Sequence, residues 1–249
     1  MISKFYSLVL FLMFLCMGSV AFAHEESDKI LSVGISADYP PFEFIENEKI
    51  VGFDVDLANK IAKKLGRELQ IQDMKFASII SAVQTGRVDF GISSFTITPK
   101  RKKNIDFSIK YYIPKFAMIY RKDTPIVSLK DFNKKIIAAQ IGSTMENFLQ
   151  DKLEAVKDFK LISLAKNPFM VEELKFGRVD GVLVEESQAK AFVKKYSNIM
   201  TYSLFGDGGY GYAIALKKGS SLKPKIDSVI RSLKKSGELK KLEKKWLTK

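Results

Sequence analysis

The sequence predicts an α/β protein built from two similar halves, and two observations lead to this prediction. Segments with strand character alternate with amphipathic helical segments along the chain, and the tetrapeptide GRVD occurs at 86–89 and again at 177–180. Each copy starts with a glycine that can end a helix in the left-handed conformation, and an apolar run follows. The alternative is a chance match between two turns. The alternation favours mainly parallel sheets flanked by helices.

The first half begins with a predicted strand at 30–36. The segment 52–66 predicts a helix that ends at Gly66, and its apolar face comprises Leu57, Ala58, Ile61, Ala62 and Leu65. A strand at 68–74, a helix at 77–86 and a strand at 88–94 follow.

The second half repeats this order after residue 112. A strand is predicted at 136–139, and the next helix opens with the capping-box spacing of Ser143 and Glu146. A strand at 160–163 precedes a helix in which Asn167 is the expected N-cap and Pro168 the first helical residue. The last strand of this half is predicted at 179–184.

Residues 1–23 have the features of a secretory signal peptide, with an early lysine, an apolar stretch and small residues before the expected cleavage after Ala23. A membrane anchor is the alternative, but the apolar run at 5–17 is shorter than the roughly 20 residues that span a bilayer. We therefore expect a soluble, periplasmic protein that begins at His24. The single cysteine, Cys16, leaves with the signal, so no intramolecular disulfide is expected.

The chain of 249 residues carries a formal net charge of +13, concentrated at its C-terminal end. Such a charge could attract nucleic acid, anionic lipid or an acidic ligand. The lysines at 231–249 are spaced around an apolar stripe, which is typical of a solvated helix face, and they lack the interleaved aromatic residues of single-strand binders. We expect no nucleic-acid partner. The stripe consists of Leu233, Leu239, Leu242 and Trp246.

Two loops follow the strands after the GRVD copies, and in open α/β sheets such loops face a ligand crevice. The first loop offers hydroxyl groups and, at an apparent helix start, the guanidinium of Arg101, which together favour a carboxylate ligand. The alternative is an ordinary helix N-cap beside a surface arginine. The hydroxyl residues are Ser93, Ser94, Thr96 and Thr98.

The second loop offers carboxylates at Glu185 and Glu186, which have the opposite charge. An arginine and a carboxylate across one crevice suit a zwitterion; solvated acidic residues are the alternative, and we prefer it for Glu186. The segment 37–44 adds aromatic side chains beside a double proline. Tyr39 is the expected ligand contact, whereas Phe42 and Phe44 are expected in the core.

Five segments together resemble the periplasmic amino-acid-binding proteins of ABC importers, and the resemblance covers residues 29–248. It implies the type II periplasmic-binding-protein fold, in which two α/β lobes are joined by two hinge strands, near 111–114 and 206–211. The first lobe would comprise 28–112 plus 209–249, and the second lobe 113–208. The segments are DYPPFEF, GFDVDLANKIAKKLG, SSFTITPKR, GSTMENF and GELKKLEKKWL.

The resemblance also implies residue roles. Arg101 would hold the ligand carboxylate with help from Thr96, Thr144 and the backbone at Ser94. Tyr39 and Phe76 would sandwich the ligand side chain. Glu185 stands where most relatives have an aspartate for the ligand ammonium.

The ligand itself is expected to be a polar or basic amino acid. Several binders of basic side chains carry a carboxylate at the position of Ser36, and Asp38 or Glu43 would have to compensate for its loss here. The predicted function is a monomeric receptor that closes over a free amino acid and delivers it to the permease of an ABC importer.

An exported enzyme of the same fold, a dehydratase of cyclic carboxylic acids, is the alternative function, with Glu185 as acid or base. The only histidine is His24 at the predicted mature terminus, and the sequence offers no metal-ligand cluster and no activated nucleophile. We therefore expect no enzymatic activity, no cofactor and no metal.

Overall fold

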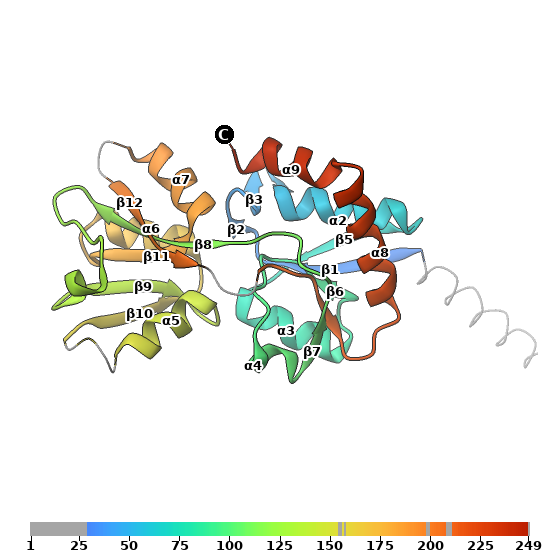
Figure 1. Ribbon diagram of the computed structural model, residues 1–249, viewed down its shortest axis with the longest axis horizontal. Helices are drawn as coiled ribbons and strands as arrows, with labels where there is room; N and C mark the ends of the chain where they lie inside the picture. Colours follow the sequence, from blue (N-terminus) through green and yellow to red (C-terminus); the bar gives the residue numbers. More distant parts are fainter. Residues whose placement is uncertain (1–28, 154–155, 157, 198–199, 208–210, 249) are drawn as a thin grey trace, which may run out of the picture.

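A computed structural model describes residues 29–248 apart from 154–155, 157, 198–199 and 208–210. The predicted signal peptide and its cleavage after Ala23 lie outside the described residues. Two sheets with helices on their faces lie side by side, and each forms one lobe (Figure 1). In the described part of the chain, no helix is long and apolar enough to cross a membrane.

Lobe 1 contains a sheet with the strand order β5-β1-β6-β13-β7. Its strands are β1 (Ile30–Ile35), β5 (Glu68–Asp73), β6 (Phe90–Gly91), β7 (Ile105–Phe107) and β13 (Ala215–Lys217). Its helices are α2 (Phe53–Lys64), α3 (Phe76–Thr85), α4 (Pro99–Lys102), α8 (Leu222–Lys235) and α9 (Glu238–Trp246).

Lobe 2 contains a sheet with the order β10-β9-β11-β8-β12. Its strands are β8 (Lys115–Arg121), β9 (Ile136–Gln140), β10 (Lys160–Leu164), β11 (Gly181–Glu185) and β12 (Met200–Asp207). Its helices are α5 (Thr144–Leu153), α6 (Asn167–Lys175) and α7 (Glu186–Lys195), with a 3₁₀ turn at Leu129–Phe132.

A small antiparallel sheet in lobe 1 was not predicted. It consists of β2 (Asp38–Tyr39), β3 (Glu43–Glu46) and β4 (Lys49–Val51). The segment with the double proline therefore folds back on itself, and this brings Asp38, Tyr39 and Glu43 to the side of lobe 1 that meets lobe 2.

The two large sheets are mixed rather than mainly parallel. Only β5, β1 and β6 in lobe 1, and β10, β9 and β11 in lobe 2, pair in parallel. In lobe 1, β13 runs antiparallel to both of its neighbours, and β8 does the same in lobe 2. These strands directly follow the crossings between the lobes, so they enter their sheets from the opposite direction.

The two crossing segments pair with each other between the lobes. The N–H of Tyr111 donates to the carbonyl of Tyr212 at 2.9 Å, and the N–H of Tyr212 donates to the carbonyl of Tyr112 at 2.8 Å. This pairing lies beside the predicted crossings, although part of the predicted segment 206–211 lies outside the described residues. The exact limits of the lobes, at 112 and 208, stay a prediction.

The two GRVD copies occupy equivalent places. Gly86 and Gly177 follow helices with φ of 76° and 72°, which is the left-handed region. The carboxylate of Asp89 then accepts the N–H of Ser32 in β1 at 2.7 Å, and that of Asp180 accepts the N–H of Ile136 in β9 at 2.8 Å. Each aspartate thus ties its loop to the central parallel strand of its own lobe.

Two predicted helix starts differ in detail. Lys166 is the N-cap of α6, and Asn167 is its first residue, so the buried side chain of Asn167 is free to reach Asp38 in lobe 1. Before α5, the hydroxyl of Ser143 accepts the N–H of Glu146 as predicted, but the carboxylate of Glu146 accepts the N–H of Gly142.

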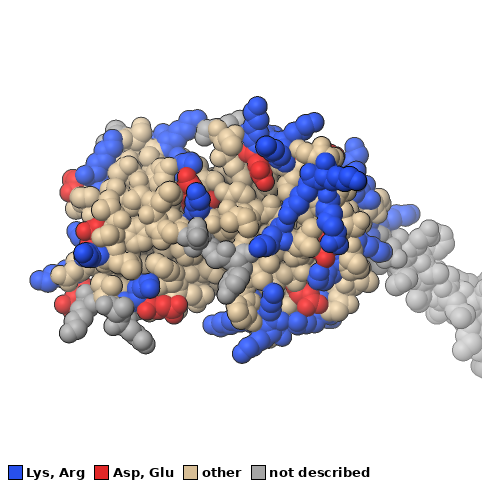
Figure 2. All heavy atoms as spheres, in the orientation of Figure 1, with Lys and Arg blue, Asp and Glu red and all other residues tan. Residues whose placement is uncertain are grey.

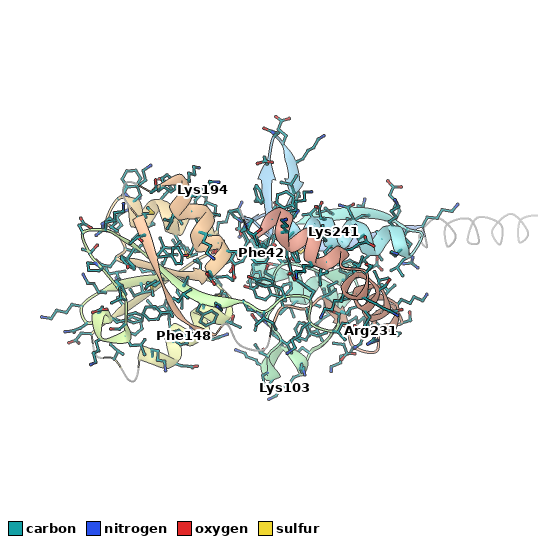
Figure 3. All side chains as sticks on the ribbon, turned by 45° about the horizontal axis from the view of Figure 1, so that its top comes forward. Phe42, Lys103, Phe148, Lys194, Arg231 and Lys241 are labelled. Atoms are coloured by element: carbon teal, nitrogen blue, oxygen red, sulfur yellow. The ribbon has the colours of Figure 1, made fainter. Side chains whose placement is uncertain are left out.

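The C-terminal helices bear out the interpretation of a solvated basic face. Leu233, Leu239 and Leu242 are buried against the core of lobe 1, and Trp246 is half-buried with its indole N–H donating to Asp56. Figure 2 shows Lys and Arg side chains gathered over the half of the molecule that holds α8 and α9. In Figure 3, Arg231 and Lys241 lie on the outer surface of these helices.

Candidate functional site

A cavity of about 410 Å³ lies between the lobes and is lined by residues of both. Seven of the eight predicted site residues line it, and Glu185 does not. In Figure 3, Phe42 marks the side of lobe 1 that faces lobe 2. The seven predicted residues in the lining are Tyr39, Phe76, Ser93, Ser94, Thr96, Arg101 and Thr144.

Arg101 extends from α4 into this cavity. Its guanidinium donates to the carbonyl of Thr96 at 2.8 Å and, across the cleft, to the carbonyl of Gly142 at 2.9 Å. The rings of Phe76 and Phe95 are stacked 4.8 Å apart, and the guanidinium carbon lies 5.6 and 5.3 Å from their centres. Burial lowers the pKa of Arg101 to about 10, so the group stays cationic at neutral pH.

The alternative interpretation of this loop was an ordinary helix N-cap beside a surface arginine, and the structure contains the N-cap. Thr98 caps α4, and its hydroxyl accepts the N–H of Arg101 at 3.1 Å. The arginine side chain is nevertheless held in the cavity rather than on the surface. Its remaining N–H groups suit an oxyanion, because a guanidinium has five donors and only two are used by the backbone carbonyls.

Hydroxyl groups from both lobes meet beside Arg101. The Oγ1 atoms of Thr96 and Thr144 are 3.3 Å apart, and they come from lobe 1 and lobe 2 respectively. Ser94 differs from the expectation, because its backbone N–H donates to Asp54 at 2.7 Å and is therefore already engaged. Its hydroxyl remains the part that could reach a ligand.

A pair of buried carboxyl groups lies at one side of the cavity, and Glu43 is the member that lines it. Glu43 accepts the hydroxyl of Ser93 at 2.7 Å through Oε1, and Asp54 accepts the N–H of Ser94 and the hydroxyl of Tyr111 through Oδ2. Their other oxygens, Glu43 Oε2 and Asp54 Oδ1, are buried and accept no hydrogen bond from any other described group.

Burial raises the pKa of both members of this pair, to about 7 for Asp54 and well above the ordinary value for Glu43. The hydrogen bonds that Asp54 accepts from Ser94 and Tyr111 favour its charged form, whereas the negative charge of Asp54 raises the pKa of Glu43 further. Glu43 is therefore the member of the pair that keeps its proton. Asp54 was missed from the sequence, although its spacing from Ala58 and Ile61 puts it on the buried face of α2.

Asp38 lies at the junction of the lobes. Its Oδ1 accepts the side-chain amides of Gln140, at the end of β9, and Asn167, both at 3.3 Å. Burial raises the pKa of Asp38 to about 6, and the two amide bonds and nearby Lys166 oppose this rise. Gln140 and Asn167 were not predicted as site residues. Their signals were weak, since one ends an apolar strand and the other looked like a helix cap.

Glu185 lies outside the cavity lining, at the end of β11. Its carboxylate caps α7 by accepting the N–H groups of Ser187 and Gln188 at 2.6 and 3.3 Å, and it also accepts the hydroxyl of Tyr112 at 2.9 Å. Burial raises its pKa to about 7. Its role in holding a ligand ammonium stays a prediction. Glu186 pairs with Lys190 at 2.6 Å, in keeping with the solvated interpretation.

The aromatic residues near the double proline differ from the prediction in which of them line the cavity and which lie in the core. Tyr39 lines the cavity but is only 7% exposed, and its ring packs on Phe42 with centres 5.8 Å apart. Phe42 is in the core as predicted, whereas Phe44 is half-buried against Trp246. Tyr212, from the second crossing, joins the lining and was not predicted.

Comparisons with known proteins agree on one family. The model of the bacterial extracellular solute-binding proteins, family 3, matches residues 31–249. The arginine-binding extracellular protein ArtP of Bacillus subtilis (strain 168) is 38% identical over 233 residues, which cover 93% of this chain and 91% of ArtP.

Solved structures give the same result. An ancestral arginine-binding protein bound to arginine is 38% identical, with a TM-score of 0.83, and the match covers 88% of this chain and 98% of that one. An ancestral arginine-binding protein bound to glutamine is 37% identical, with a TM-score of 0.83 and coverage of 89% and 99%. Both the fold and the lobed arrangement are therefore shared with solute receptors.

Proposed function

Because the chain belongs to the bacterial extracellular solute-binding proteins, family 3, we propose that it is a receptor for an amino acid with a basic side chain. The ligand binds between the two lobes, which close over it, and the closed protein delivers it to the permease of an ABC importer. The observation that carries this proposal is an interlobe lining that contains the half-buried Arg101 together with the buried acidic side chains of Asp38 and Glu43.

The ligand carboxylate is assigned to the surroundings of Arg101. A guanidinium with three N–H groups not used by backbone carbonyls, beside the hydroxyls of Thr96 and Thr144, provides charge-assisted hydrogen bonds to a carboxylate. Thr144 belongs to lobe 2, so a carboxylate held here contacts both lobes and favours their closure.

The basic side chain is assigned to Asp38 and Glu43, which line the same cavity and are 8% and 1% exposed. A buried carboxylate is costly unless it is paired, so a guanidinium or ammonium ligand group would pair with Asp38 and would favour release of the proton from Glu43, which could then pair with it too. These groups take the place of the carboxylate that is missing at Ser36. Arginine is the first candidate, because its planar guanidinium can bind a carboxylate through two parallel hydrogen bonds.

The ligand ammonium is assigned to Glu185, as the resemblance implies. The carboxylate lies next to Val184, which lines the cavity, so a change of side-chain rotamer or of closure would bring it to the ligand. Tyr39, Phe76, Ser93 and Ser94 complete the proposed ligand contacts.

Membership in an extracellular family makes this an exported protein. We further propose cleavage after Ala23, release into the periplasm, action as a monomer, and no binding of nucleic acid. The named relatives are binding proteins, so the enzyme alternative gains no support from them.

The experiment is a calorimetric titration of the ligand-stripped chain that begins at His24. L-Arginine, L-lysine, L-ornithine, L-citrulline, L-glutamine and L-cystine are compared, with prephenate as the probe for the enzyme alternative. Citrulline is the decisive control, since it has the shape of arginine without the charge. We expect basic amino acids to bind with Kd on the order of micromolar, and citrulline at least about tenfold more weakly.

Arg101→Ala should abolish this binding, whereas Arg178→Ala should preserve it. Arg178 is an exposed arginine paired with Glu173 in lobe 2, so it controls for the loss of an arginine as such. Binding of no amino acid, or tight binding that survives Arg101→Ala, would contradict the proposal.

A further inference from the structure

Asp38 receives its hydrogen bonds from the opposite lobe. Asp38 belongs to β2 of lobe 1, whereas Gln140 and Asn167 belong to β9 and α6 of lobe 2. Among the described residues, these two amides are the only side-chain or backbone donors recorded for its carboxylate, each at 3.3 Å. The contact can therefore form only when the lobes come together.

All three side chains are buried in this contact. Asp38, Gln140 and Asn167 are 8%, 5% and 1% exposed. Separation of the lobes would return them to water, so closure removes a carboxylate from solvent and gives it two amide donors in exchange. The nearby charges also differ by lobe, because Lys166 of lobe 2 attracts the carboxylate and Asp73 of lobe 1 repels it.

Two other interlobe hydrogen bonds differ, because they use groups that a bound ligand would contact. Arg101 with Gly142, and Thr96 with Thr144, involve groups assigned above to the ligand carboxylate. A ligand would reorganise those contacts. The contact of Asp38 with two amides is made by the protein itself, so it contributes to closure before any ligand carboxylate is considered.

We propose that Asp38, held by Gln140 and Asn167, is a positioning residue that sets how readily the two lobes close. The carboxylate needs donors on the facing lobe, and lobe 2 presents two amides at that place. Replacement of an amide by a carboxylate would put like charges at hydrogen-bond distance and keep the lobes apart. This inference rests on the proposed function only in that closure accompanies binding.

The test exchanges the two groups across the cleft. Asn167→Asp places two carboxylates in contact, and the double variant Asp38→Asn with Asn167→Asp restores one carboxylate and one amide in the reverse order. Asn147→Asp, at an exposed position of α5 in the same lobe, controls for the added charge. The three variants and the wild-type protein are produced as the chain that begins at His24.

Two readouts are compared at pH 7.5. Spin labels at Lys103→Cys and Gln150→Cys, both exposed and in different lobes, report the interlobe distance with and without 1 mM L-arginine. The chain from His24 lacks a native cysteine, so labelling is specific. Calorimetry reports the Kd for L-arginine.

We expect Asn167→Asp to deplete the closed distance population of the ligand-free protein, and the double variant to recover most of it. L-Arginine binding should stay weakened in the double variant, because Asp38 is the carboxylate assigned to the ligand side chain. Asn147→Asp should match the wild type. An unchanged distance distribution in Asn167→Asp, or a double variant no better than the single one, would overturn the inference. So would a wild type that lacks a closed population with and without arginine.

Failure of the proposed function gives a different result. In that case arginine would not bind, while the closed population of the ligand-free wild type would still respond to Asn167→Asp and to the compensating change.

Discussion

The substitution Glu43→Gln tests whether burial keeps a proton on Glu43 in the folded state. In the wild type the folded state keeps a proton on Glu43 next to Asp54, whereas the unfolded chain loses it near the ordinary pKa of a glutamate. The folded state therefore binds one more proton than the unfolded state above that pKa, and stability falls as pH rises. Glutamine is uncharged at every pH and has the shape of protonated Glu43, and its carbonyl can accept the hydroxyl of Ser93.

The size of the effect follows from the retained proton. A proton kept by the folded state alone costs roughly 1.4 kcal/mol per pH unit, so the wild type should lose about 2.7 kcal/mol more stability than Glu43→Gln between pH 5 and pH 7. Asp38, Asp54 and Glu185 also titrate in this range, and because all three are present in both proteins, the comparison reports the proton at position 43.

The assay is urea denaturation of the ligand-free protein at pH 5, 6 and 7, followed by circular dichroism. Glu46→Gln is the matched control, since Glu46 lies on the same strand but is exposed. The difference between Glu43→Gln and the wild type should grow with pH, and Glu46→Gln should show no such trend. A pH-independent difference, or one below about 1 kcal/mol across the range, would refute the retention of a proton by Glu43.

Three further predictions concern binding and folding. Arg101→Lys should weaken L-arginine binding by about 100-fold in calorimetry, because one ammonium cannot serve two backbone carbonyls and the ligand; Arg178→Lys should change nothing. Affinity for L-arginine should rise about tenfold from pH 5 to 7.5, since Asp38, with a pKa of about 6, attracts the ligand only when ionised; a flat profile would contradict this role. Asp89→Ala and Asp180→Ala should each lower the unfolding free energy by about 1–3 kcal/mol in urea, because a partly buried backbone N–H loses its partner; neutral effects would show that the repeat has no structural role.

Local features of the chain were predictable because they depend on interactions between residues that are close in the sequence. The helix ends at Gly66, Gly86 and Gly177 follow from the left-handed conformation that glycine adopts without strain, and all three have positive φ. The apolar spacing of α2 likewise identified its buried face. The repeated GRVD indicated two halves, and its aspartates perform the same task in each.

Contacts between distant parts of the chain explain why some sequence-based predictions differ from the fold. The crossing strands reverse direction after they change lobes, so half of the pairing in each sheet became antiparallel. Asn167 looked like a helix cap because residues 167–168 have the local chemistry of one, yet its amide meets Asp38 of the other lobe. Glu185 was expected to face the ligand, but in the fold its carboxylate caps α7 at the end of β11.

The sequence alone determined the central parallel strands, the helices that flank them, the two-lobed family and the residues around Arg101, since periodicity, glycine and a contiguous motif carry that information within short stretches. Only the tertiary structure decided that Asp54 lies under Glu43, that Asp38 meets two amides across the cleft, and that these carboxyl groups have raised pKa values. Burial and partners fix protonation, and both come from segments far apart in the chain that meet only when the lobes pack together.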